Sequence, residues 1–432
     1  MLLTLFEPRR GGRYDEVEDP AISSTARELP AWPLYTLLYG FPFIWALGMA
    51  QFMPTILALI MLAYMVARRE IVIFRAQWIW IALCIWTVVC TVSLHGGSDI
   101  LAWGLRFVII FNAGIYSIYL FNARERVTSH GIMIGLIVVW YTVVILGWLS
   151  LQFPDFRLTT PMSMIMPGGL VSNELVKDYV MPPLAEVQLP WGAPEPYVRP
   201  SAPFPYANSW GLAFTFLTPI VLATMSASSS LWIKICLGFS VIAGLVPAVA
   251  TSNRGMFIGL AICVGYVIMR QVMAGNLKVA VWALIGALLA VVTLVGSGAL
   301  AKILGRQEYS DSTGGRASLY AATWDAVMQS PVVGYGTARM NVSIGVSMGT
   351  QGYLWALMFC FGLVGLGLFL AFMVYSILTT WGVQSDAGMW IHSVPVTAIF
   401  VFVFYSFDTM QMAAMMLCLS LMMRSAAYRE GL

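Results

Sequence analysis

Three arginines in this 432-residue chain stand where a guanidinium group could bind an anion at a membrane surface. Arg254 lies in the short polar sequence Thr-Ser-Asn-Arg-Gly (251–255), between two long apolar runs, and Arg199 and Arg316 lie in two long polar segments. The guanidinium fork donates paired hydrogen bonds to phosphate oxygens and keeps its proton at neutral pH. Several arginines on one face could therefore hold a diphosphate and stabilise its negative charge as it leaves, without a metal ion.

The composition places these arginines on a membrane protein. Hydrophobic residues make up 59% of the chain, charged residues only 10%, and the mean hydropathy is +0.81, whereas soluble domains carry roughly 25% charged residues. Apolar runs of about 20 residues match the thickness of a bilayer core. Because backbone polar groups must be satisfied inside lipid, we expect an all-α polytopic membrane protein. The net charge of +3 gives no indication of a nucleic-acid partner.

The runs predict a bundle of about 12 transmembrane helices, with ten to twelve consistent with the pattern. The expected spans are residues 33–50, 51–67, 78–95, 100–122, 131–152, 206–226, 231–250, 255–273, 278–297, 352–378, 389–407 and 409–423. The first two are the least regular, because Gly40, Pro42 and Pro54 interrupt them.

The orientation follows from Lys and Arg in the short connections, which gather on the cytoplasmic side of membrane proteins. With residues 1–32 as a cytoplasmic tail, the basic connections after the second, fourth and eighth spans fall inside, as does the tail 424–432. Arg254 is the exception, since it lies in a short external connection. The transmembrane domain then covers residues 33–423, with two large external loops at 153–205 and 298–351.

The two external loops differ in pattern. Residues 153–205 are rich in proline and are expected to be irregular and folded against the bundle. The second loop carries a helical pattern from Arg316 to Met328, with Leu319, Thr323, Ala326 and Val327 on one face. Pro331 should end that helix, and Gly334-Tyr335-Gly336 predicts a tight turn after it.

Within the spans, Arg106 is a charged residue that calls for a functional interpretation. It could equally extend to the outer interface. Arg254 could anchor lipid headgroups, and Arg199 and Arg316 could be solvated loop charges. The scarcity of acidic residues near the midplane argues against an ion-coupled transporter. Candidates for a general base are the external carboxylates Glu174, Asp178, Glu186, Glu195, Glu308 and Asp311.

The motifs of metal and nucleotide chemistry do not occur. There is no His/Asp/Glu cluster with metal spacing, no glycine-rich phosphate loop and no serine-nucleophile elbow. All six cysteines lie in apolar runs and are best read as small buried hydrophobes. We expect no metal and no cofactor.

Four segments in order resemble the O-antigen ligase and O-antigen polymerase superfamily of bacterial membrane glycosyltransferases. They are residues 199–211 leading into a span, residues 251–255 opening the next inward span, residues 315–336, and residues 350–354 running into 361–365. The resemblance covers about residues 199–380.

The resemblance implies a metal-independent transfer or polymerisation of glycan from a polyprenyl-diphosphate-linked oligosaccharide to a glycan or lipid acceptor. It places the reaction on the outer face of the bacterial cytoplasmic (inner) membrane, where the protein would contact membrane lipids. The reaction would serve cell-surface polysaccharide assembly, and an envelope assembly complex would be a further partner. Arg199, Arg254 and Arg316 would be the catalytic residues. Substrate binding would fall to Arg106, Asn208, Asn253, Gly334, Gly336, Thr350 and Gln351.

The chain departs from the family at one position. The family often has a His-Asn pair entering the span after the second loop, where this sequence has Thr350-Gln351. That difference disfavours a histidine-assisted ligase and leaves a polymerase, a divergent transferase or an inactive relative open. The alternative function is a transporter or flippase of an anionic lipid-linked amphiphile, which would use the same arginines for binding alone. A scaffold in an envelope assembly complex is a third alternative.

Overall fold

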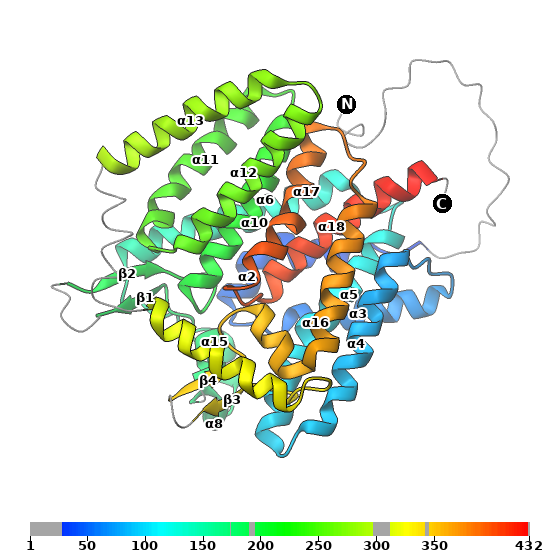
Figure 1. The fold of residues 1–432 in the computed structure, drawn as a ribbon, viewed down its shortest axis with the longest axis vertical. Coiled ribbons are helices and arrows are strands. Elements are labelled where there is room, and N and C mark those ends of the chain that lie inside the picture. The colour runs from blue at the N-terminus through cyan, green and yellow to red at the C-terminus, as the bar shows by residue number, and fades with distance from the viewer. Residues whose placement is uncertain (1–27, 173, 190–194, 297–311, 342–344, 431–432) are drawn as a thin grey trace.

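The computed structural model describes residues 28–172, 174–189, 195–296, 312–341 and 345–430. They form a helical bundle with two small antiparallel hairpins (Figure 1). In chain order the helices of the first half are α1 (Trp32–Tyr39), α2 (Phe41–Ala46), α3 (Met53–Arg68), α4 (Arg75–Val89), the 3-10 turn η1 (Cys90–Ser93), α5 (Gly97–Asn122), α6 (Ser129–Gln152), α7 (Pro161–Ile165), α8 (Gly168–Val171) and α9 (Glu174–Val180). Those of the second half are α10 (Ala207–Ala227), α11 (Leu231–Ala250), α12 (Arg254–Met273), α13 (Leu277–Gly296), α15 (Ser312–Gln329), α16 (Tyr353–Thr379), α17 (Asp386–Val401) and α18 (Thr409–Glu430).

Eight helices in the described residues are long and apolar enough to cross a membrane. They are α4 with η1, α5, α6, α10, α11, α12, α16 and α18. The all-α polytopic fold is confirmed, and the count of twelve spans is not. Residues 33–50 are not one span, because α1 ends at Tyr39 and α2 begins at Phe41. Pro42 lies in the first turn of α2, where its missing N–H costs nothing, so the chain breaks just before it.

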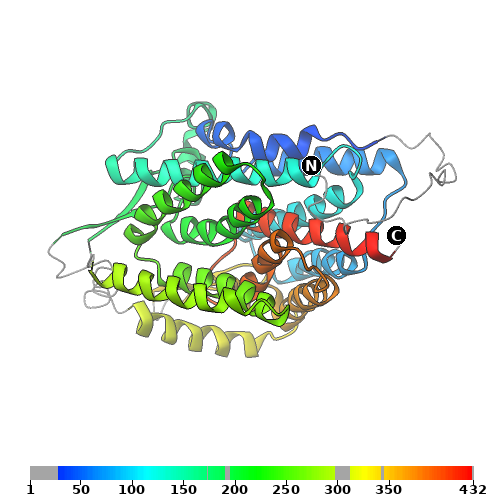
Figure 2. The same cartoon turned by 90° about the horizontal axis from the view of Figure 1, so that it is seen from above.

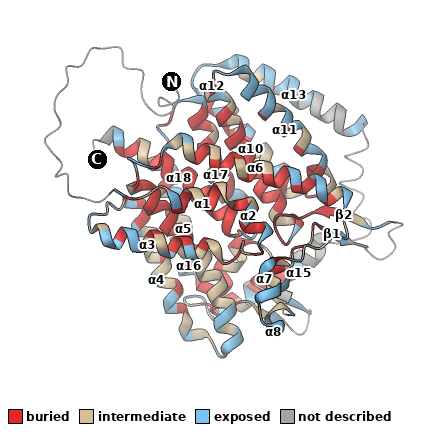
Figure 3. Cartoon of the chain, turned by 180° about the vertical axis from the view of Figure 1, so that it is seen from behind, coloured by how far each residue is buried: buried red, intermediate tan, exposed pale blue. Residues whose placement is uncertain are grey.

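The core of the bundle surrounds α18. In α18, 89% of the apolar span is buried, and the helix packs chiefly along α5. Buried residues fill the middle of the molecule while pale, exposed positions lie along α11 and α13 (Figure 3). On α11 the exposed side chains include Trp232, Phe239 and Ile242, which suits a surface that faces lipid. The helices are stacked in layers when seen from above (Figure 2).

Helix ends that the charge pattern assigns to one side do lie together. Arg68 Nη1 donates to the carbonyl of Asn122 at 3.1 Å, and Arg424 Nη1 donates to the carbonyl of Val127 at 2.8 Å. The hairpins and α15 gather at the end of the molecule away from the C-terminus (Figures 1 and 3). The assignment of the first side to the cytoplasm stays a prediction.

The segment 153–205 is more ordered than its prolines predict. It contains α7, α8, α9 and the antiparallel pair β1 (Ala185–Gln188) and β2 (Tyr197–Pro200), in which Glu186 faces Arg199. In the second loop, α15 begins four residues before the predicted start and is followed by the hairpin of β3 (Arg339–Asn341) and β4 (Val346–Met348). Its predicted inner face is confirmed, since Leu319, Thr323 and Val327 are buried.

The turn at residues 331–336 fits into a break in α16. Gly362 interrupts that helix with φ 68° and ψ −177°. The freed carbonyls are satisfied by the turn, because Tyr335 N donates to Phe359 O at 2.9 Å and Gly336 N to Cys360 O at 2.8 Å. Gly334 and Gly336 have φ of +70° and +72°, so the predicted tight turn is confirmed.

We predict that Gly362→Ala destabilises the protein by at least about 2 kcal/mol, because a Cβ there would lie 2.0 Å from the carbonyl oxygen of Val332 and would sit in a glycine-only region of φ and ψ. Gly367→Ala in the same helix is the control. A Cβ at Gly367 meets nothing within 4 Å, so its thermal unfolding midpoint in detergent should stay at or above that of the wild type. Equal midpoints for the two variants would contradict the role assigned to the break.

Candidate functional site

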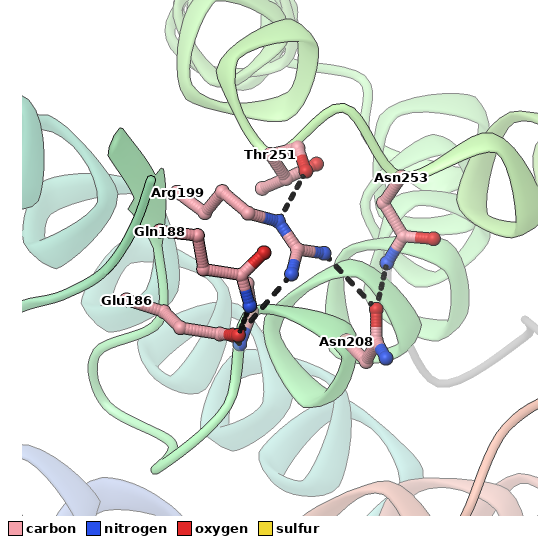
Figure 4. Close-up of polar contacts among 7 residues, drawn as sticks. Glu186, Gln188, Arg199, Asn208, Thr251 and Asn253 are labelled. Carbon is pink, nitrogen blue, oxygen red and sulfur yellow. Dashed lines mark hydrogen bonds and ion pairs between the residues drawn. The ribbon is translucent and has the colours of Figure 1, made fainter. Parts of the chain in front are cut away.

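Arg199 is the centre of a buried polar network at one end of the bundle (Figure 4). Only 4% of the residue is exposed. Its Nε donates to the carbonyl of Thr251 at 2.9 Å, its Nη2 donates to Oδ1 of Asn208 at 3.2 Å, and its Nη1 forms an ion pair with Oε1 of Glu186 at 3.3 Å. The guanidinium therefore ties β2 to the end of α11 and to the first turn of α10.

The β1–β2 hairpin explains why this ion pair forms. Its register places Glu186 directly opposite Arg199, so both side chains leave the hairpin on the same face. The second oxygen of Glu186 accepts from the amide of Ala207 at 3.1 Å, which puts a carboxylate at the positive N-terminus of α10. Glu186 also accepts from Gln188 Nε2. With these bonds in place, Glu186 is a structural anion rather than an available base.

Asn208 and Asn253 link this network to Arg254. Oδ1 of Asn208 accepts from Nδ2 of Asn253 at 3.4 Å, and Oδ1 of Asn253 accepts from the hydroxyl of Tyr405. The side chain of Asn253 makes no capping bond to α12, although it occupies the position before that helix. Arg254 thus stands in the first turn of a 20-residue helix, where backbone N–H groups and the helix dipole favour an anion.

Arg254 lines a cavity of ≈ 430 Å³, which we call the Arg254 cavity. Its wall consists of Asn208, Asn253, Arg254, Gly255, Ile258, Ala317, Tyr320, Val403, Phe404 and Tyr405. The ring of Tyr320 stacks on Trp355 with centroids 4.2 Å apart, which fixes α15 over the start of α16. Ala317 follows Arg316 in α15, so the helix brings the Arg316 backbone to the edge of this cavity. The described residues do not include the Arg316 side chain.

Arg106 and Thr350 lie in a second cavity, of ≈ 410 Å³, which we call the Asp408 cavity. Nη1 of Arg106 donates to the carbonyl of Ala102 at 3.0 Å and to Oγ1 of Thr337 at 3.2 Å. The hydroxyl of Thr350 donates to the carbonyl of Ser347 at 2.7 Å. Most of the remaining wall is apolar, and its other polar side chains include Gln51, Tyr179, Tyr206, Ser209, Thr337, Ser347 and Ser406.

One stretch of backbone separates the two cavities. In the connection between α17 and α18, residues 403–405 line the Arg254 cavity and residues 406–408 line the Asp408 cavity. The first turn of α10 also borders both cavities, because Asn208 lines the Arg254 cavity and Ser209 lines the Asp408 cavity. This partition is held in place because Tyr353 N donates to Tyr405 O at 2.7 Å and Ser406 Oγ donates to Thr350 O at 3.0 Å.

The structure thus joins some of the predicted site residues and separates others. Arg199, Asn208, Asn253 and Arg254 form one continuous group, with the Arg316 backbone beside it. Arg106 and Thr350 belong to the other side of the partition, and half-buried Gln351 follows Thr350 just before α16. Gly334 and Gly336 pack against the break in α16, where they shape the backbone. Direct contact of any of these residues with a substrate stays a prediction.

Sequence reasoning overlooked Asp408, Tyr405 and Tyr320. Asp408 accepts from the amide of Thr409 at 3.0 Å and faces the second cavity. Burial raises the pKa of Asp408, although the Thr409 amide partly opposes this. A carboxylate in a short connection between two apolar runs was the signal available in the sequence. No three His, Cys, Asp or Glu side chains gather as a metal site within the described ranges.

Fold and site together define a multi-pass helical membrane protein with a cationic, amide-lined cavity at one end of its bundle. Residues 239–370 match the family described as O-antigen ligase, which confirms the resemblance seen in the sequence. The match covers about a third of the chain, and together with the apolar helices it supports a membrane glycosyltransferase-like function. The matched segment holds Arg254, Arg316 and Thr350 but not Arg199. No curated protein matches the chain.

Proposed function

We propose that this protein transfers or polymerises glycan from a polyprenyl-diphosphate-linked donor, with the diphosphate bound in the Arg254 cavity. The observation that carries the proposal is the position of Arg254. It stands at the N-terminus of α12, in a cavity of ≈ 430 Å³ whose other polar groups include the amides of Asn208 and Asn253. A guanidinium fork and a helix N-terminus at the same point both favour phosphate oxygens.

In this proposal the arginines have different tasks. Arg254 makes bidentate contact with the diphosphate and stabilises the charge that develops on it as the glycosidic bond breaks. Arg316 adds a second cation from α15. Arg199 is a positioning residue, because its nitrogens already bond to Thr251, Asn208 and Glu186. It holds the two asparagine amides that border the bound anion.

The surroundings of the Arg254 cavity suit a lipid-linked sugar. Ile258 lines the cavity and is 51% exposed on α12, so the cavity reaches a face of the helix that we assign to lipid. The polyprenyl tail would leave along this face. Tyr320 and Phe404 offer aromatic surface to the sugar or to the first isoprene units. The metal-independent reaction would take place on the outer face of the bacterial inner membrane, with both termini cytoplasmic, for cell-surface polysaccharide assembly.

Reconstitution of the purified protein with a lipid extract that contains polyprenyl-diphosphate oligosaccharides tests the proposal. We expect release of polyprenyl diphosphate together with a glycan that has gained sugar. The O-antigen ligase match favours this outcome over the alternative of a flippase for an anionic lipid-linked amphiphile. Movement of the donor across the bilayer without any release of polyprenyl diphosphate would favour the flippase and reject the transferase.

A further inference from the structure

We propose that the Asp408 cavity is the acceptor site and that Asp408 takes the proton from the attacking sugar hydroxyl. This inference rests on the proposed function and extends it to the second substrate. It starts from the layout of the two cavities, which lie back to back across residues 403–408. The edge of the partition is open to solvent, since Ser406 and Tyr206 are exposed, so two bound substrates could meet over it.

The lining of the Asp408 cavity suits a sugar more than a diphosphate. Its largely apolar wall carries several hydroxyl groups, including those of Tyr179, Ser209 and Thr350, which can donate to or accept from sugar hydroxyls. Its one guanidinium in the described residues, that of Arg106, is already bonded to Ala102 and Thr337. The carboxylate of Asp408 on the same wall would repel a diphosphate.

Asp408 has an oxygen to spare for this task. Its Oδ1 accepts from the amide of Thr409 at the start of α18, and within the described residues no hydrogen bond engages Oδ2. The backbone bond fixes the carboxylate at the wall of the cavity. Burial raises the pKa of Asp408, which makes its anion a stronger base.

Other external carboxylates are engaged elsewhere. Glu186 is held by Arg199 and by the amide of Ala207. Asp178 is held by Arg157, with Nη1 and Oδ1 2.6 Å apart. Thr350, which stands where the family often has a histidine, lines the same cavity as Asp408. The cavity beside Thr350 therefore contains a carboxylate, that of Asp408, although it lacks the histidine that the family often has there.

The chemical step balances without a further reactant. The acceptor hydroxyl oxygen forms a bond to the anomeric carbon of the donor while its proton passes to the Asp408 carboxylate. The bond from that carbon to the diphosphate oxygen breaks, and the diphosphate leaves with the electron pair. Protonated Asp408 then returns its proton to water. Direct displacement of this kind inverts the configuration at the anomeric carbon.

The test compares Asp408→Asn with Asp325→Asn in the reconstituted protein, using a total lipid extract of the cells that make it. Asparagine is as good a helix cap as aspartate, so α18 should still begin normally. Asp325 is an exposed carboxylate on α15 and serves as the control. We expect Asp408→Asn to lower the turnover rate by about 100-fold or more, with binding of polyprenyl diphosphate unchanged and with Asp325→Asn like the wild type.

The pH profile separates a base from a structural residue. Because the pKa of Asp408 is raised, wild-type turnover should fall on the acid side at a higher pH than an ordinary carboxyl would give, and Asp408→Asn should lose this acid limb. The titratable and charged groups that share the cavity wall are Arg106, Tyr179, Tyr206 and Tyr353, from α5, α9, the segment before α10, and α16. An Asp408→Asn variant whose turnover rate is within threefold of the wild-type rate, and which keeps the acid limb, would overturn the inference. The proposed function would still stand.

A second pair of variants does not depend on Asp408. Ala338 lines the Asp408 cavity and Ala317 lines the Arg254 cavity, so a tryptophan at either position fills one cavity. Ala338→Trp should raise the acceptor concentration needed for half-maximal turnover and leave polyprenyl diphosphate binding intact, whereas Ala317→Trp should weaken that binding. If instead Ala338→Trp weakened polyprenyl diphosphate binding and Ala317→Trp raised the acceptor concentration needed, the donor and acceptor sites would be the other way round and the inference would be rejected. A wild-type protein without turnover would reject the proposed function as well.

Discussion

Arg254→Lys is expected to lower the kcat/KM of glycan transfer by about 100-fold to 1000-fold, the loss seen when one donor to a developing oxyanion is removed. Lysine keeps the positive charge but has a single ammonium group in place of a planar fork. The effect should fall mainly on kcat, because the charge on the diphosphate increases as the glycosidic bond breaks. The side chain is half-buried and lysine keeps its positive charge, so we expect a thermal midpoint close to that of the wild type.

The measurement is the rate of polyprenyl diphosphate release at several donor concentrations. Arg126→Lys is the matched control, since Arg126 lies at the opposite end of the bundle with 63% of its side chain exposed and pairs with Glu28. That variant should behave as the wild type does. Full activity in Arg254→Lys would show that the fork is not needed and would leave Arg254 as an interfacial anchor.

Arg199→Met is expected to destabilise the protein by about 3 kcal/mol or more, because it leaves a partly buried carboxylate without its cation. Both partners are largely shielded from water, with 5% of the Arg199 side chain and 27% of the Glu186 side chain exposed. The carbonyl of Thr251 and the amide of Asn208 would lose a donor as well. Thermal unfolding in detergent would show the loss as a lower midpoint.

Glu186→Gln added to Arg199→Met should recover part of that stability. Glutamine removes the unpaired charge and keeps an oxygen for the amide of Ala207. Recovery of stability without recovery of activity would identify Arg199 as a residue that positions Asn208 and, through it, Asn253 beside the anion. If Arg199→Met unfolded at the wild-type midpoint, the buried network could not be what holds this end of the bundle together.

Much of the helical framework follows from hydropathy alone. The break at Thr251–Gly255 was visible as a polar interval between two apolar runs, and Leu319, Thr323 and Val327 showed the buried face of α15. Gly40 and Pro42 were recognised as an interruption of residues 33–50, but the apolar composition on both sides did not show that the run divides there into α1 and α2. The β1–β2 hairpin was missed because prolines and polar residues hide the short alternation at Ala185–Gln188.

The candidate site was predicted in its residue types and only partly in its arrangement. Sequence reasoning placed Arg199, Arg254 and Arg316 on one face, and Arg199 and Arg254 indeed lie at the same end. It could not show that Arg199 is buried under the hairpin, because this depends on the register that pairs it with Glu186. Nor could it show two cavities, because the partition between them is formed by the connection at Tyr405 and beyond, and Tyr405 lies 152 residues after Asn253 in the chain.

A structure of the protein with polyprenyl diphosphate bound in a lipid nanodisc tests the central claim most directly. We predict phosphate density in the Arg254 cavity, within hydrogen-bond distance of the Arg254 guanidinium and of the first N–H groups of α12, with the tail leaving past Ile258. Diphosphate in the Asp408 cavity beside Arg106, with the Arg254 cavity empty, would contradict it.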